Sequence, residues 1–188
     1  MSNQEYIRTT IVGIAGSGKT TYLKSRIGNK SIIFDPLREF KKGFIFHPHN
    51  RVDPKEEYEK ILYQEIIKPY EREGKQPYED LIIDECNRPY PNKIPLPPMM
   101  AYINDFNRHL KLNVFIVARR LSQLNTDLVE LSHKVIIFKQ TGINDIKRAN
   151  DIIEGAGDQL RTLKKYHYIE IYEGQYSINE PISLKKKV

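Results

Sequence analysis

The sequence predicts an α/β fold in which a mostly parallel central sheet is flanked by helices. Two observations carry this prediction. Short apolar segments alternate with segments of helical periodicity, and several apolar segments are hydrophobic at every position, as strands are when both faces of a sheet are covered. In addition, residues 6–14 are rich in β-branched side chains and lead directly into a glycine-rich loop and a helix.

The expected elements follow one another along most of the chain. Strands are expected at residues 6–14, 31–35, 43–46, 81–84, 113–118 and 134–138. Helices are expected at residues 19–26, 54–67, 99–109, 125–131 and 144–154. Residues 166–172 and 175–179 predict a β-hairpin around Glu173-Gly174, an antiparallel addition to the sheet. The proline-rich stretch 87–98 can continue neither a helix nor a central strand and is expected to be a loop.

Length and composition favour one domain that spans residues 1–188. With 39% hydrophobic residues, a chain of this length can bury one substantial core and has little left for a second. Its one cysteine, Cys86, excludes an intrachain disulfide and fits a reducing, intracellular setting. No signal peptide is evident, and no apolar run approaches the roughly 18 residues of a membrane span, so we expect a soluble protein without a membrane partner. The net charge of +6 favours polyanionic partners such as nucleic acid.

A phosphate-binding loop is the strongest motif. Residues 13–20, Gly-Ile-Ala-Gly-Ser-Gly-Lys-Thr, match that motif at every fixed position and lie between an expected strand and an expected helix. Glycines let backbone N–H groups turn toward phosphates, Lys19 reaches the β/γ oxygens, and Thr20 offers a hydroxyl to Mg²⁺. The sequence therefore predicts a P-loop NTPase that uses ATP and Mg²⁺. The expected nucleotide-binding residues are Gly13, Ala15, Gly16, Ser17, Gly18, Lys19, Thr20 and Thr21.

Two adjacent carboxylates end a later strand. Asp84 and Glu85 follow the apolar run Leu81-Ile-Ile. In P-loop enzymes such a strand end supplies one acid to the Mg²⁺ shell, here Asp84 beside Thr20, and a second acid that polarises the attacking water, here Glu85. Small-molecule kinases rarely need that second acid, so the pair favours ATP hydrolysis.

Arginines are candidates for stabilising the transition state. An arginine beside the γ-phosphate stabilises the charge that develops there, and in ring-forming ATPases it often comes from the neighbouring subunit. Arg119, Arg120 and Arg148 are the candidates, and for each the alternative is an ordinary salt bridge.

From about Ile7 to Asp151 the sequence resembles the FtsK/HerA superfamily of ring-forming DNA translocases, especially its small viral genome-packaging ATPases. Beside the two nucleotide motifs, the resemblance rests on residues 114–125 and 131–145. Members place a polar sensor and an arginine after the fourth core strand. Here Arg120 matches the arginine, whereas Arg119 stands where the family usually has a sensor glutamine, and Gln123 or Asn125 could replace it.

The resemblance implies a RecA-like fold of the ASCE type and an ATPase that translocates double-stranded DNA to package a viral genome into a capsid. It also implies a homo-oligomeric ring, a capsid portal or vertex protein as partner, and a location in the host cytoplasm or on the virion or procapsid. One alternative is a filamentous-phage assembly ATPase of the zonula-occludens-toxin type, which usually carries a membrane segment. A second alternative is a nucleoside or nucleotide kinase, which Glu85 and the Arg119-Arg120 pair disfavour. A third is a nucleotide-gated binding module that hydrolyses slowly or not at all, which the complete pair of nucleotide motifs disfavours.

Overall fold

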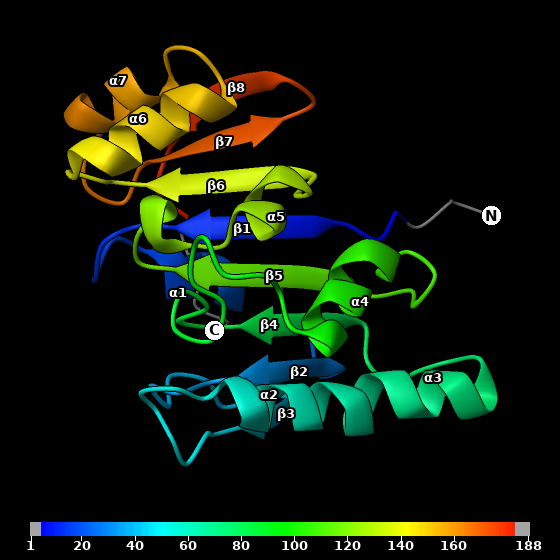
Figure 1. The fold of residues 1–188 in the computed structure, drawn as a ribbon. Helices are drawn as coiled ribbons and strands as arrows, with labels where there is room; N and C mark the ends of the chain where they lie inside the picture. The colour runs from blue at the N-terminus through cyan, green and yellow to red at the C-terminus, as the bar shows by residue number, and fades with distance from the viewer. Residues whose placement is uncertain (1–4, 183–188) are drawn as a thin grey trace.

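A computed structural model describes residues 5–182. Its strands form one eight-stranded sheet in the order β3-β2-β4-β5-β1-β6-β7-β8 (Figure 1). Strands β3 through β6 in that order run parallel, whereas β7 and β8 are antiparallel additions at one edge. The strands are β1 (Arg8–Val12), β2 (Ser31–Phe34), β3 (Phe44–Phe46), β4 (Asp80–Ile83), β5 (Asn113–Ala118), β6 (Lys134–Phe138), β7 (Tyr168–Tyr172) and β8 (Gln175–Asn179). The predicted mostly parallel sheet and its terminal hairpin are confirmed.

Helices cover both faces of this sheet. They are α1 (Lys19–Lys24), α2 (Lys55–Leu62), α3 (Lys68–Glu73), α4 (Pro98–Phe106), α5 (Thr126–Glu130), α6 (Ile143–Ile152) and α7 (Ala156–Thr162), with a π-helical turn η1 (Tyr63–Ile67) and a 3₁₀ turn η2 (Leu121–Gln123). Side chains of α2, α4, α5, α6 and α7 pack in one apolar cluster, and those of α1 belong to the cluster on the opposite face. The strands β1, β2, β4, β5 and β6 are therefore buried on both faces, whereas the edge strands β3 and β8 are partly exposed.

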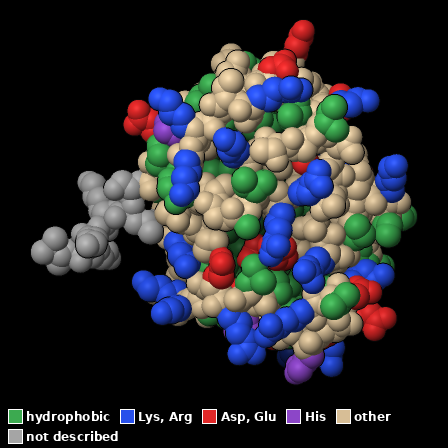
Figure 2. Space-filling model, turned by 90° about the vertical axis from the view of Figure 1, so that its left-hand side faces the viewer, with side chains coloured by type: hydrophobic (Ala, Val, Ile, Leu, Met, Phe, Trp, Pro, Cys, Tyr) green, Lys and Arg blue, Asp and Glu red, His purple; other side chains and the backbone are tan. Residues whose placement is uncertain are grey.

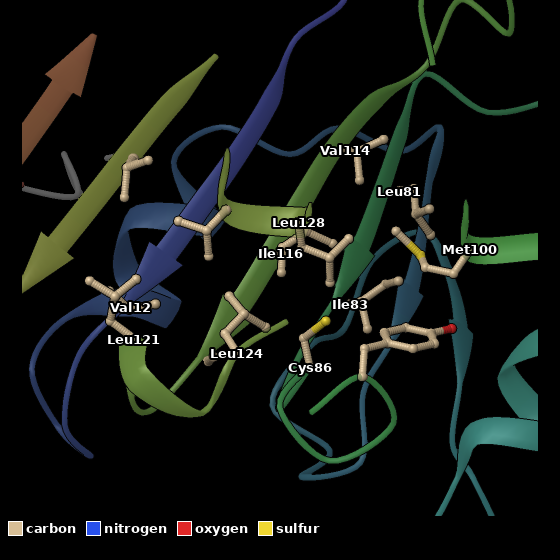
Figure 3. Close-up of a cluster of buried hydrophobic side chains, with 14 of the residues drawn as sticks. Val12, Leu81, Ile83, Cys86, Met100, Val114, Ile116, Leu121, Leu124 and Leu128 are labelled. Atoms are coloured by element: carbon tan, nitrogen blue, oxygen red, sulfur yellow. The ribbon is translucent and has the colours of Figure 1, made fainter. Parts of the chain in front are cut away.

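Successive strand residues illustrate this two-sided burial. Ile11 belongs to the α1 cluster and Val12 to the opposite one, and both are fully buried. Figure 3 shows the larger cluster, in which Leu81 and Val114 of the sheet lie with Met100 of α4. At roughly 25 cal/mol per Å² of buried apolar area, such a core dominates the favourable free energy of folding.

The helix expected to end near Ile67 is longer than its sequence pattern indicates. It begins at Lys55, passes through the π-helical turn η1, and continues as α3 to Glu73, where Gly74 follows with φ of 66°. Pro69 interrupts the pattern because it has no N–H to donate. A π-helical turn just before the proline accommodates this loss without ending the helix.

The helix α7 was not predicted from the sequence. It starts after Gly155 and contains Gly157, and two nearby glycines normally argue against a helix. The packing explains Gly157: a Cβ there would approach the backbone oxygen of Ile146 in α6 to 2.1 Å. The close contact between α6 and α7 thus requires a glycine.

The strand order brings distant segments of the chain to one edge. The carboxyl ends of the parallel strands all lie on the same side of the sheet, and ligands of open α/β sheets bind outside these ends. The loops that follow β1, β4, β5 and β6 therefore meet, although they are far apart in the sequence. None of the helices in the described part of the chain has the length and apolar character of a membrane span.

Candidate nucleotide-binding site

The phosphate loop connects β1 to α1 and depends on its glycines. Gly16 and Gly18 have φ of 71° and 114°, which side chains other than glycine rarely adopt. A Cβ at Gly13 would lie 2.5 Å from Ser17 Oγ and 2.6 Å from Phe138 Cβ, so that position has no room for a side chain. The loop is therefore shaped so that its backbone can approach a ligand closely.

Two polar side chains of the loop, Lys19 and Ser17, would donate hydrogen bonds to a phosphate bound there. Lys19 Nζ donates to the carbonyl oxygens of Gly13 at 2.8 Å and Ile14 at 3.2 Å, folding back over the loop. Burial lowers the pKa of Lys19, while the charges of Asp84 and Glu85 oppose that shift. Ser17 Oγ is buried and has no hydrogen-bond partner within residues 5–182. An anion in the loop would supply partners to both side chains.

The residues expected to hold Mg²⁺ follow two strands of the parallel sheet that are separated by β5: Thr20 lies in α1 after β1, and Asp84 directly follows β4. Asp84 follows β4 and is buried, and its Oδ1 accepts the backbone N–H of Glu85 at 2.9 Å. Burial raises the pKa of Asp84 to about 7, and the nearby charges of Glu85 and Glu39 add to this effect. Thr20 Oγ1 donates to Glu39 Oε2 at 2.6 Å.

This set of donors fits Mg²⁺, which prefers oxygen ligands and is usually bound by one or two carboxylates together with substrate phosphates. Within residues 5–182 no group of three or more histidine, cysteine or acidic side chains is placed to hold a metal. In the mode that Mg²⁺ prefers, Thr20 and Asp84 would bind it together with the phosphates of a nucleotide.

Glu85 is held in an unusual conformation beside Asp84. Its φ is 51°, in the left-handed region that non-glycine residues seldom occupy, and its side chain is only 7% exposed. Its carboxylate Oε1 accepts a hydrogen bond from Arg119 Nε at 2.7 Å. This bond raises the pKa of Arg119. The neighbouring strands β4 and β5 place the two residues side by side.

The other two candidate arginines have partners elsewhere in the chain. Arg120 Nε donates to Asp145 Oδ2 of α6 at 3.1 Å, and its side chain stays 44% exposed. Arg148 donates to the carbonyl oxygen of Leu124 at 3.2 Å and to Thr126 Oγ1 at 3.3 Å. Of the three arginines, the structure brings Arg119 into contact with the acidic pair.

The residues considered for the sensor role have different environments. Asn125 caps α5, with its side-chain oxygen accepting the N–H of Asp127 at 2.9 Å, and it also donates to Ile94 O at 2.7 Å. These bonds give Asn125 a structural role. Gln123 is exposed in η2.

Sequence reasoning missed Glu39 and Gln140. Glu39 lies in the loop after β2, where the buried carboxylate of Asp35 accepts the backbone N–H groups of Glu39 and Phe40, each at 3.0 Å. Gln140 is buried just after β6 and donates to the carbonyl oxygen of Arg119 at 2.9 Å. Their positions in the sequence could have identified them, because both are polar residues that closely follow a parallel strand, where ligands bind.

The edge that carries the site also carries many basic side chains. Figure 2 shows this side of the molecule, with lysines and arginines spread around a small acidic group. Exposed basic residues in the loops at this edge include Arg38, Arg51, Arg88, Arg119, Arg120 and Lys165. Such a distribution is typical of a surface that binds polyanions.

The fold and the geometry of the phosphate loop are those of a P-loop protein. No family model and no curated protein matches the sequence. Among solved structures, the genome packaging NTPase B204 of Sulfolobus turreted icosahedral virus 2 in complex with AMPPCP has a TM-score of 0.77 at 20% identity, covering 94% of this chain and 98% of that one. Its complex with ATP-gammaS gives 0.75 at 19% identity over the same shares.

A second similar structure comes from a different protein. The N-terminal domain of zonular occludens toxin from Neisseria meningitidis has a TM-score of 0.56 at 16% identity, covering 97% of this chain and 96% of that one. At these identities the likeness shows a shared fold. This shared fold confirms the predicted P-loop architecture.

Proposed function

We propose that this chain is an ATP-hydrolysing double-stranded DNA translocase that packages a viral genome into a capsid. The observation that carries the proposal is the meeting of Lys19, Asp84 and Glu85 at one edge of the sheet, inside a face rich in basic side chains. The fold shared with a genome packaging NTPase supports the packaging role.

The residues divide the chemistry among themselves. The loop amides and Lys19 bind the β- and γ-phosphates and stabilise the negative charge that moves onto the leaving group. Thr20 and Asp84 would hold Mg²⁺, which neutralises phosphate charge. Glu85 orients the attacking water and takes a proton from it, and Arg119 positions the Glu85 carboxylate through its 2.7 Å hydrogen bond.

The kinase alternative fits the site less well. A kinase must keep water away from the γ-phosphate and bring an acceptor hydroxyl to it. Here a second, buried carboxylate stands beside Asp84, and an arginine holds it in place. That arrangement favours activation of water.

Binding to DNA would use the basic face. Exposed lysines and arginines attract the phosphate backbone without reading the base sequence, which suits a motor that must move along any sequence. A single chain of 188 residues can hardly encircle a duplex, so we propose a homo-oligomeric ring formed from single-domain subunits. A capsid portal or vertex protein would be its partner, in the host cytoplasm or on the procapsid.

The test is ATP hydrolysis measured as release of inorganic phosphate, with and without long double-stranded DNA. We expect hydrolysis that DNA stimulates, with a stimulation that weakens as salt rises because backbone contacts are salt dependent. Lys19→Ala serves as the control for contaminating activity. Transfer of phosphate to a nucleoside or nucleotide acceptor without phosphate release would establish the kinase alternative. If DNA leaves the rate of hydrolysis unchanged at every salt concentration, the proposed translocation is refuted.

A further inference from the structure

A small cavity opens beside the phosphate loop. Its volume is about 210 Å³, and Gly18 and Thr21 form one wall of it. Phe138 at the end of β6 and Tyr166 in the turn before β7 form an aromatic wall. Binding sites for whole drug-sized ligands measure roughly 300–1,000 Å³, so this cavity suits one part of a larger ligand.

The sheet topology explains why these segments meet. Strand β7 runs antiparallel to β6, with Tyr168 paired to Phe138, so the turn that precedes β7 lies at the carboxyl edge of the parallel strands. Strand β8 pairs its last residue, Asn179, with Tyr168, which returns Pro181 and Ile182 to the same edge and into the cavity wall. Because β6 is also the neighbour of β1, this corner adjoins the phosphate loop.

Tyr166 is held close to the loop in a constrained conformation. Its φ is 66°, and a hydrogen bond from His167 N to Lys164 O at 3.2 Å closes the turn around it. A Cβ placed on Gly18 would lie 3.6 Å from Tyr166 Cδ1, an ordinary contact distance. The residue is nevertheless 44% exposed, and Lys165 Nζ lies 4.9 Å from the centroid of its ring. A large aromatic side chain is thus fixed at the loop without being buried in the core.

The order of the strands gives the direction in which a nucleotide must lie. Asp84 and Glu85 follow β4, and β5 separates that strand from β1. The γ-phosphate, which reacts with water, must face that side. Strands β6 and β7 lie on the other side of β1, next to Thr21 and the cavity. The nucleoside end of a bound triphosphate therefore leaves the loop toward the cavity.

We propose that this cavity binds the base of the nucleoside triphosphate by stacking on Tyr166. The inference rests on the proposed function, because it requires that the phosphate loop binds a nucleotide. Aromatic, proline and isoleucine side chains supply most of the wall, and Thr21 is the short polar side chain among them. Stacking tolerates any base because each has a π-face.

This chemistry has a consequence for specificity. Sites that discriminate strongly do so by hydrogen bonds to the substrate, which leave buried polar groups unpaired when the wrong substrate binds. The side chains of this wall that could form such bonds are Thr21 and the two tyrosines, Tyr22 and Tyr166, and none of them carries a charge. We therefore expect ATP and GTP to bind with affinities within about tenfold of each other.

The experiment is calorimetric titration with a non-hydrolysable ATP analogue and Mg²⁺, and separately with inorganic tripolyphosphate, which has no base. Tyr166→Ala should weaken binding of the analogue about tenfold, while Tyr166→Phe keeps the ring and binds like wild type. Neither change should alter the affinity for tripolyphosphate. Tyr63→Ala is the matched control, because Tyr63 is 41% exposed on the opposite face of the sheet and should change nothing.

The outcomes separate this inference from the proposed function. If Tyr166→Ala binds the analogue as wild type does while Lys19→Ala loses it, the base site is wrong and nucleotide binding stands. If Tyr166→Ala weakens binding of the analogue and tripolyphosphate equally, Tyr166 shapes the phosphate loop and the base site is again wrong. If the wild-type chain binds neither compound, the proposed function itself fails.

Discussion

The carboxylate of Glu85 and the guanidinium of Arg119 form a 2.7 Å hydrogen-bonded ion pair between the ends of two neighbouring strands. The acid is buried and the arginine is about half exposed, so the pair joins the interior of the site to its surface. In this position Arg119 fixes the direction of the Glu85 carboxylate.

Glu85→Gln should leave nucleotide binding nearly unchanged and slow hydrolysis by about 10²- to 10⁴-fold, because the amide keeps the size of the side chain but cannot accept a proton from water. Single-turnover hydrolysis together with calorimetric binding checks both parts. The matched control is Glu79→Gln, since Glu79 is an exposed acid before β4, at the opposite edge of the sheet. Normal turnover in Glu85→Gln would show that another group activates water.

Arg119→Ala and Glu85→Gln should not have additive effects on stability. Removing the arginine leaves a buried carboxylate without its partner, whereas removing it from the Glu85→Gln background does not. We expect a coupling free energy of about 1 kcal/mol from chemical denaturation of the two single variants, the double variant and wild type. If the changes in the free energy of unfolding of the single variants add up to that of the double variant, the ion pair orients the Glu85 carboxylate but does not stabilise the fold.

Glu39→Gln should raise the Mg²⁺ concentration needed for nucleotide binding by about tenfold, because groups that orient metal ligands typically contribute about 10- to 100-fold to metal affinity. The contact at issue is the 2.6 Å hydrogen bond from Thr20 to Glu39. Titrating Mg²⁺ at fixed nucleotide measures the effect, with Glu79→Gln again as control. If the Mg²⁺ requirement is unchanged, Glu39 has no role in metal binding and its hydrogen bond with Thr20 is incidental.

Lys19→Ala should abolish hydrolysis and weaken binding of the triphosphate, since the ammonium is the mobile cation of the loop. In the structure this ammonium donates hydrogen bonds to the carbonyl oxygens of Gly13 and Ile14. On binding of a triphosphate it would donate to phosphate oxygens. Lys24→Ala, at the exposed end of α1, is the matched control. The assignment of the phosphate loop would be lost if Lys19→Ala turned over ATP like wild type.

The parts of this fold that could be predicted are those set by local patterns. The phosphate loop needs glycines at fixed spacings, and Asp84-Glu85 directly follows an apolar run, so both are visible in the sequence. The contact between Thr20 and Glu39 could not be predicted, because it depends on the loops after β1 and β2 meeting across β4 and β5. Tertiary packing, which local propensity does not report, also determines helix α7 with its Gly157.

The roles of the arginines could be predicted only in part, because they too depend on tertiary contacts. Their residue type indicated a role in stabilising charge, and the motif position favoured Arg120. Their partners depend on which loops meet: Arg119 contacts Glu85, while Arg120 contacts Asp145 in α6. A residue supplied by a neighbouring subunit cannot be recognised within one chain, so its role needs a test between subunits.

Assembly provides that test. A motor whose arginine acts across a subunit boundary needs its neighbours before it hydrolyses efficiently, so specific activity should rise with protein concentration. Arg120 is our first choice for this role, ahead of Arg148 and Arg119. Its side chain is 44% exposed, and its Nε donates to the buried carboxylate of Asp145. That bond does not use the terminal nitrogens of the guanidinium, so they are available to a second subunit.

Mixing inactive Lys19→Ala subunits with inactive Arg120→Ala subunits should therefore restore part of the turnover. A Lys19→Ala subunit lends its intact arginine to a neighbour whose phosphate loop is intact, so some interfaces in each mixed ring are complete. The matched control is a mixture of Lys19→Ala with Glu85→Gln. In the proposed mechanism both of these residues act within the subunit that binds the nucleotide, so no interface becomes complete and activity should stay absent. Thermal melting of Arg120→Ala checks that the buried Asp145 tolerates the loss of its partner. If activity per chain is constant on dilution and the first mixture recovers nothing, Arg120 does not act in trans and a monomeric enzyme explains the site better.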